Sequence, residues 1–170
     1  MRLRDTQRSK LYAWETELFD VKAEINQSAT GAAEIVKITT PPMMEIKEIK
    51  KLVTKVARDY GLSHRKVAVG DGRGRRRACY SPSTREIKLP RWARKQWVVL
   101  HELAHWIEYV LHPKRAAWHG REFTGIYMEL LRRYDGRDMQ EMRTSANRMR
   151  VDFMPNSECT ARYLKKHGLR

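Results

Sequence analysis

The chain has 170 residues, of which 41% are hydrophobic, and it carries a formal net charge of +15. This length and apolar content predict one folded domain with a real core and exclude a wholly disordered chain. No apolar run reaches the roughly 18 residues of a membrane span, and the charged first ten residues do not resemble a signal peptide. We therefore expect a cytoplasmic protein without a membrane partner, and the excess positive charge favours a polyanionic one.

The amino-terminal part predicts one helix and a linker. Over residues 4 to 19, Leu11, Trp14 and Leu18 recur at spacings of three and four, which predicts a helix that packs on the rest of the protein. The pattern then weakens, with a loop expected at 26 to 31 and a short strand at 35 to 38. We assign residues 1–43 to this helix and linker.

The next segment predicts a helix and a small sheet. Residues 44 to 60 predict an amphipathic helix closed by Gly61. Strands are predicted at 66 to 69, 78 to 80 and 86 to 89, and we expect an antiparallel sheet. Glu86 to Leu89 either forms an exposed edge that holds a substrate as an added strand or only completes the sheet.

A glycine-rich turn at residues 70 to 77 separates two of these strands. Asp71 is the only acidic residue nearby, so the four arginines of the turn cannot all pair locally. They are either a surface without a partner or a contact for the nucleic-acid backbone. We call this group the arginine turn: Arg73, Arg75, Arg76 and Arg77.

An H-E-x-x-H pattern lies between Trp97 and Leu111, a segment with apolar residues at helical spacing. Two histidines four apart on a helix can bind one metal ion, and the glutamate beside the first is placed to take a proton from water. We therefore predict His101 and His105 as zinc ligands and Glu102 as general base. The alternative is a pair of buried core histidines.

Several residues compete as third ligand. A metzincin pattern would need Gly at position 108 and His at 111, where this chain has Glu108 and Leu111. His112 lies about 10 Å along the helix axis from His105, and Glu108 is expected as a partner of a ligand or as an exposed or capping carboxylate. We predict His119, at a turn made by Gly120 before a second helix with Phe123, Ile126, Leu130 and Tyr134 on one face.

The remaining chain predicts one more helix and a tail. Residues 138 to 150 are expected to be helical, with Met139, Met142 and Met149 towards the body. Residues 156 to 170 are polar and basic and form either a flexible arm or a last helix. We assign 44–135 to the core and 136–170 to this helix and basic tail.

The run LHELAH, followed by HGREF and an amphipathic helix, resembles the SprT-like zinc metallopeptidases. The hairpin ending in REIKLP also resembles that family, and the opening RDTQRSKLYAWE is similar to metallohydrolases of actinobacteria and their phages. The resemblance covers about residues 44 to 135. It implies an α+β, zincin-like fold, proteins bound to DNA as substrates, Glu102 as general base, and zinc held by His101, His105 and His119. The cysteine-rich zinc ribbon of many members is missing, because the chain has only Cys79 and Cys159.

We therefore predict a zinc-dependent metallopeptidase that acts on a protein substrate. A further group must stabilise the oxyanion, and Tyr127, Tyr80 and Arg121 are the candidates. One alternative is a DNA-binding or phage regulatory module with a structural zinc, for which His112 or Cys79 would be the fourth ligand. Another is a protease that cuts a single regulator.

Overall fold

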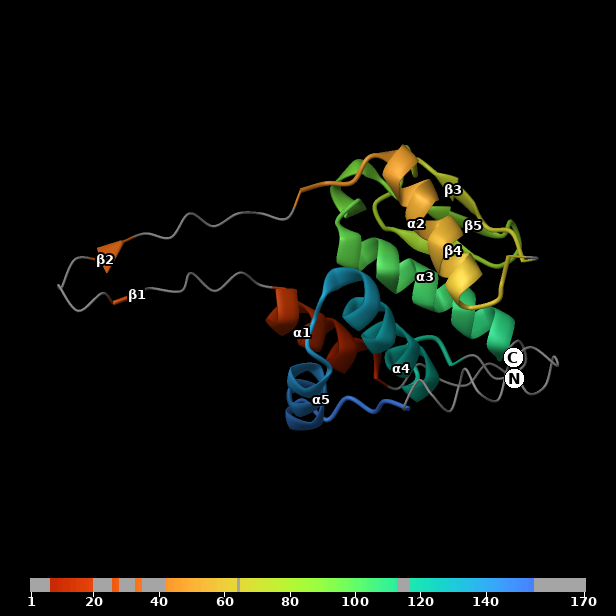
Figure 1. Ribbon diagram of the computed structural model, residues 1–170. Coiled ribbons are helices and arrows are strands. Elements are labelled where there is room, and N and C mark those ends of the chain that lie inside the picture. Colours follow the sequence, from red (N-terminus) through yellow and green to blue (C-terminus); the bar gives the residue numbers. More distant parts are fainter. Residues whose placement is uncertain are drawn as a thin grey trace.

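The computed structural model describes residues 7–19, 26–27, 33–34, 42–63, 65–112 and 117–154. This part has an α+β architecture with five α-helices and a small mixed sheet of three strands. Helix α3 (Gln96–Leu111) lies in the middle, with α2 (Ile46–Asp59) and the sheet on one side (Figure 1). The other side is covered by α1 (Arg8–Phe19), α4 (Arg121–Leu130) and α5 (Met139–Arg148).

The helices form where the apolar spacing predicted them. Leu11 and Trp14 of α1 are fully buried, so this helix packs on the rest of the protein as expected. Helix α2 begins with a capping box in which the backbone N–H of Glu45 donates to Glu48 Oε2 at 2.8 Å. It ends before Gly61, whose φ of 66° provides the predicted stop.

One hydrophobic core draws side chains from all three predicted segments of the chain, including Leu11 of α1, Ile49 of α2 and Met142 of α5. Met139 and Met149 pack against the same core, so the predicted orientation of α5 is confirmed. Helix α4 continues as a π-helical turn (Leu131–Asp135) before Gly136. These contacts hold α1 and α5 against the central helices.

The sheet differs from the prediction in its order and direction. Strand β5 (Glu86–Lys88) lies between β3 (Ala68–Gly70) and β4 (Cys79–Ser81). β4 is antiparallel to β5, but β3 is parallel to it, so the predicted antiparallel sheet was wrong. The glycine-rich turn carries the chain past β5, and β4 then pairs on its far side. Because β5 is paired on both sides, Glu86 to Leu89 is not an exposed edge, and the edge that meets α3 belongs to β4.

In the linker, strand β1 (Asn26–Gln27) pairs with β2 (Ala33–Glu34), so the predicted loop at 26 to 31 begins in a strand. The strand predicted at 35 to 38 and the tail at 156 to 170 lie outside the described residues. Among the helices that the structure describes, none has the length and apolar character needed to cross a membrane.

Candidate metal centre

Three histidine side chains converge beside α3. His101 and His105 stand one turn apart on this helix, and His119 comes from the turn before α4. The Nε2 atom of His119 lies 3.1 Å from Nε2 of His105 and 3.3 Å from Nε2 of His101. Tetrahedral ligands about 2.0–2.1 Å from a zinc ion are about 3.3 Å apart, so the nitrogens fit one ion. The cluster can therefore hold a metal ion, and imidazole suits zinc, copper, iron and nickel.

The cluster is buried, with each histidine only 5% exposed. Burial, and to a lesser degree the neighbouring His101 and His119, hold the pKa of His105 well below its ordinary value. A neutral imidazole is the form that binds a metal ion. Glu108, one turn further along, is 1% exposed, so the exposed carboxylate considered at this position was wrong.

The backbone at His119 is in the left-handed region, with a φ of 67°. For a residue other than glycine, this conformation costs about 1–2 kcal/mol. Gly120, which was expected to make the turn, instead caps α4 with a φ of −73°. Such strain persists where the surrounding structure requires it, and here the strained residue brings its imidazole to the other two.

Glu15 of α1 supports the cluster, and the sequence prediction missed it. Its Oε1 lies 2.5 Å from Nδ1 of His101, and Glu15 is 4% exposed. A carboxylate on Nδ1 orients the ring and directs Nε2 to a metal. Burial alone would lower the pKa of His101, but the charge and hydrogen bond of Glu15 raise it. The sequence did contain a sign of this role, because Glu15 is an acidic residue between Trp14 and Leu18, close to the apolar side of the helix.

Glu102 lies beside the cluster and is held by the edge strand. Its Oε2 accepts a hydrogen bond of 2.6 Å from the backbone N–H of Tyr80 on β4. Burial raises the pKa of Glu102, while His101 and the Tyr80 amide partly oppose this shift. Glu102 is 6% exposed, so one peptide group of β4 fixes a buried carboxylate next to the histidines.

A pocket of about 680 Å³ opens onto His101 and Glu102. Helix α1 forms one wall, where the ring of Tyr12 stacks on His101 with centroids 6.0 Å apart and meets His119 edge-on at 5.3 Å. The Arg8 guanidinium lies 5.5 Å from the centroid of the Tyr12 ring and lines the same pocket. A phenol and a guanidinium that the sequence did not single out therefore flank the approach to the cluster.

The three predicted oxyanion stabilisers lie in different places. Tyr127 is fully buried on α4, and its hydroxyl donates to the carbonyl of Trp97 at 3.3 Å. Tyr80 turns its ring into a second pocket, and Arg121 is exposed at the start of α4. The described lining of the pocket over the cluster contains none of the three.

The arginine turn is exposed between β3 and β4. Gly72 is required in it, because φ is 59° and an added Cβ would meet the backbone nitrogen of Pro90 at 2.5 Å. Arg73 Nε lies 3.8 Å from Asp71 Oδ2, and among the described residues no other ion pair involves the turn. Arg77 also lines the pocket over the cluster, so the turn reaches the candidate site.

A fourth protein ligand would indicate a structural metal. Among the residues that the structure describes, the possible ligands at this point are the three histidines. Cys79 on β4 and His112 at the end of α3, which were considered as fourth ligands, do not belong to this group. Three protein ligands leave a coordination position for water or substrate, whereas structural zinc sites usually have four.

Comparisons with protein-family models, curated proteins and solved structures found no match to this chain. Its fold and site define it as an α+β protein with a buried three-histidine centre that can hold a metal ion. Any function must therefore be inferred from the geometry of these residues.

Proposed function

We propose that the protein is a zinc-dependent metallopeptidase of the SprT-like type. The observation that supports this most is a set of three histidine nitrogens, 3.1 and 3.3 Å apart, beside the buried carboxylate of Glu102. Their order, H-E-x-x-H and then H-G-x-x-F from His119 to Phe123, resembles that family. Three protein ligands and a nearby carboxylate are what zinc hydrolysis requires.

The reaction depends on Glu102 as the proton carrier. When bound, Zn²⁺ supplies Lewis acidity that polarises a peptide carbonyl and lowers the pKa of water towards about 7. Because the Tyr80 amide holds Oε2, Oε1 is the oxygen of Glu102 that accepts the proton of the attacking water. The same carboxyl group then donates this proton to the leaving amine.

Tyr12 and Arg8 are the residues best placed to stabilise the oxyanion. Both line the pocket with His101 and Glu102, and Tyr12 is 40% exposed, so a substrate can reach it. Hydroxyl and guanidinium donors aimed at a developing negative charge are the usual electrophilic groups of such sites. In this proposal α1 is part of the active site.

The substrate peptide lies along β4. This strand is at the sheet edge next to α3, and the N–H of Tyr80 points to Glu102 rather than to β5. The N–H and C=O of one strand residue point to the same side, so the Tyr80 carbonyl is available to a peptide in the cleft. The edge is short, which leaves much of the binding to side-chain pockets.

Proteins bound to DNA are the substrate class that we propose. The net charge of +15 favours a polyanion, and the arginine turn extends from the sheet beside the active site. Backbone phosphates held by this turn would bring bound proteins close to Glu102.

Replacing Glu102 by Gln tests the proposal. The amide cannot accept a proton, so we expect the cleavage rate of casein or a DNA-bound protein to fall by about 100-fold to 10,000-fold. Zinc content and melting temperature should not change. Glu141→Gln, an exposed change on α5, is the control. Undiminished cleavage by the Glu102→Gln protein would show that Glu102 is not the base.

A further inference from the structure

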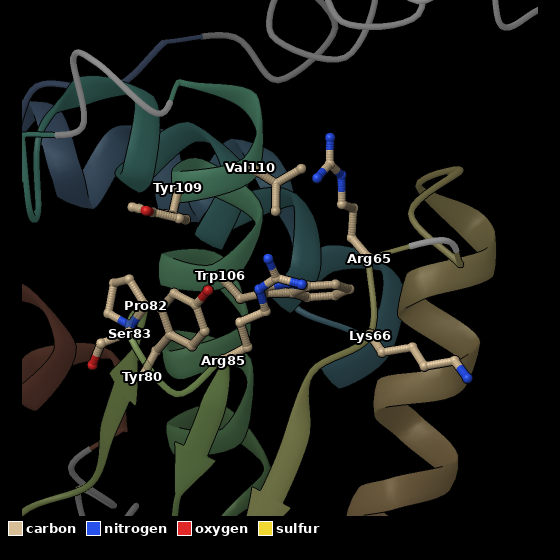
Figure 2. Close-up of a pocket in the computed structure, with 9 residues that line it drawn as sticks. All are labelled: Arg65, Lys66, Tyr80, Pro82, Ser83, Arg85, Trp106, Tyr109 and Val110. Carbon is tan, nitrogen blue, oxygen red and sulfur yellow. The ribbon is translucent and has the colours of Figure 1, made fainter.

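A second pocket, of about 410 Å³, lies at the other end of β4 (Figure 2). It is formed by the turn between β4 and β5, the segment before β3 and the carboxyl-terminal half of α3. Three basic and three aromatic side chains provide most of its chemistry: Arg65, Lys66, Arg85, Tyr80, Trp106 and Tyr109.

The positive charge of this pocket is not neutralised locally. Its described lining contains no acidic residue. Arg65, Lys66 and Arg85 form no ion pair with an acidic residue in the part of the chain that the structure describes. Burial raises the pKa of Tyr80 to about 12, so this phenol keeps its proton and adds no negative charge. The pocket is therefore complementary to an anion.

Backbone hydrogen bonds fix the main chain at two of the basic residues. The N–H of Arg65 donates to the Leu62 carbonyl at 2.7 Å, and the carbonyl of Arg85 accepts from the N–H of Ala68 at 2.8 Å. Figure 2 shows the Arg85 side chain beside the ring of Tyr80. Both arginine side chains are exposed, and a guanidinium presents a planar pair of donors that matches a carboxylate.

Tyr80 connects this pocket to the candidate active site. Its backbone N–H is 2.6 Å from Glu102 Oε2, while its ring lines the second pocket. Ala78 lines the first pocket and Pro82 the second, so β4 runs from one pocket towards the other. At about 3.3 Å per residue, the second pocket lies within about three peptide residues of the bond beside Glu102.

We propose that this pocket is a substrate subsite that selects an aspartate or glutamate side chain within about three residues of the scissile bond. The proposal depends on the metallopeptidase function proposed above. A nucleobase fits less well, because the rings of Tyr80 and Tyr109 are inclined by 60° with centroids 6.2 Å apart and do not form a parallel slot. An acidic peptide segment also suits the charge of the whole protein.

Binding and cleavage of matched peptides test the two proposals separately. A series of peptides of one fixed length, with Glu or Gln placed at each position in turn, is titrated against zinc-loaded Glu102→Gln protein and is also given to the parent. We expect the peptide with Glu at one position to bind about 10-fold more tightly than the peptide with Gln there. This difference in affinity corresponds to one charge-assisted hydrogen bond. Arg65→Ala should remove this preference, and so should Arg85→Gly, which accepts the native φ of 50°. Lys51→Ala, exposed on α2, should leave it unchanged.

Equal binding of Glu and Gln peptides would overturn the subsite, even if the parent cleaves both. A preference that survives in both arginine variants would also overturn it. So would an oligonucleotide that binds through the same two arginines more tightly than the acidic peptide. If the pocket selects acidic peptides but the parent cleaves none, the binding site stands and the metallopeptidase function is wrong.

Discussion

Removing the negative charge of Glu15 should weaken metal binding although Glu15 is not a ligand. Its Oε1 is 2.5 Å from Nδ1 of His101, and both residues are about 5% exposed, so water screens the pair little. Loss of such a partner typically weakens metal binding 10–100-fold, which is about 1.4–2.7 kcal/mol. In Glu15→Gln the amide oxygen can still accept from Nδ1–H, so we expect a loss of about 10-fold. Glu15→Ala removes the acceptor, and we expect zinc affinity to fall by about 100-fold.

Competition with a chromogenic zinc chelator measures these affinities. Glu17→Gln is a matched control, because the same change on the same helix affects a carboxylate that contacts Ser145 and Arg148 instead of His101. Unchanged zinc affinity in Glu15→Ala, or an equal loss in Glu17→Gln, would refute the supporting role of Glu15.

His119→Gly removes the third ligand without straining the backbone, which has a φ of 67° at this position. Zinc affinity should therefore fall by roughly 100-fold or more, with little loss of stability in the metal-free protein. Metal analysis and melting curves measure these two effects. Tyr12→Phe should reduce kcat by about 100-fold with zinc content unchanged, and an unchanged kcat would remove the phenol from the mechanism. Replacing all four residues of the arginine turn by alanine should make the slope of log affinity for duplex DNA against log salt shallower by roughly two to four units. A parent protein without DNA affinity, or an unchanged slope in the variant, would exclude the turn as a DNA contact.

Periodicity and spacing were sufficient to predict the central part of the site. The apolar repeat around His101 and His105 predicted a buried helix, and α3 confirms it. The convergence of His119 with the other two histidines could be predicted because it stands directly before the second helix and few residues after the first. Its left-handed backbone could not, since the neighbouring Gly120 was the residue with the usual conformational freedom.

The contribution of α1 could not be predicted from local patterns. Helical periodicity identifies the side of a helix that is buried but not the residue that it meets. Glu15 and His101 are 86 positions apart, and nothing in the spacing of either helix pairs them. Tyr12 was missed for the same reason, because it lies outside the apolar repeat that predicted the packing of α1.

The sheet shows a second limit of sequence reasoning. Each strand was located from alternation within a few residues, but three short strands can be ordered in several ways at similar local energy. The order depends on which side of β5 the glycine-rich turn delivers β4. Because the turn delivers it to the side opposite β3, β4 is the edge strand beside Glu102. The second pocket also depends on this order, because the pairing of β3 with β5 lets Arg65 and Arg85 line the same pocket.

The coordination of the metal ion tests the central claim most directly. We predict that a crystal structure of the zinc-loaded protein has one ion bound by Nε2 of His101, His105 and His119 at about 2.0–2.1 Å, with a solvent molecule in the fourth position. A fourth side-chain ligand would indicate a structural site, and zinc bound elsewhere would contradict the proposed centre.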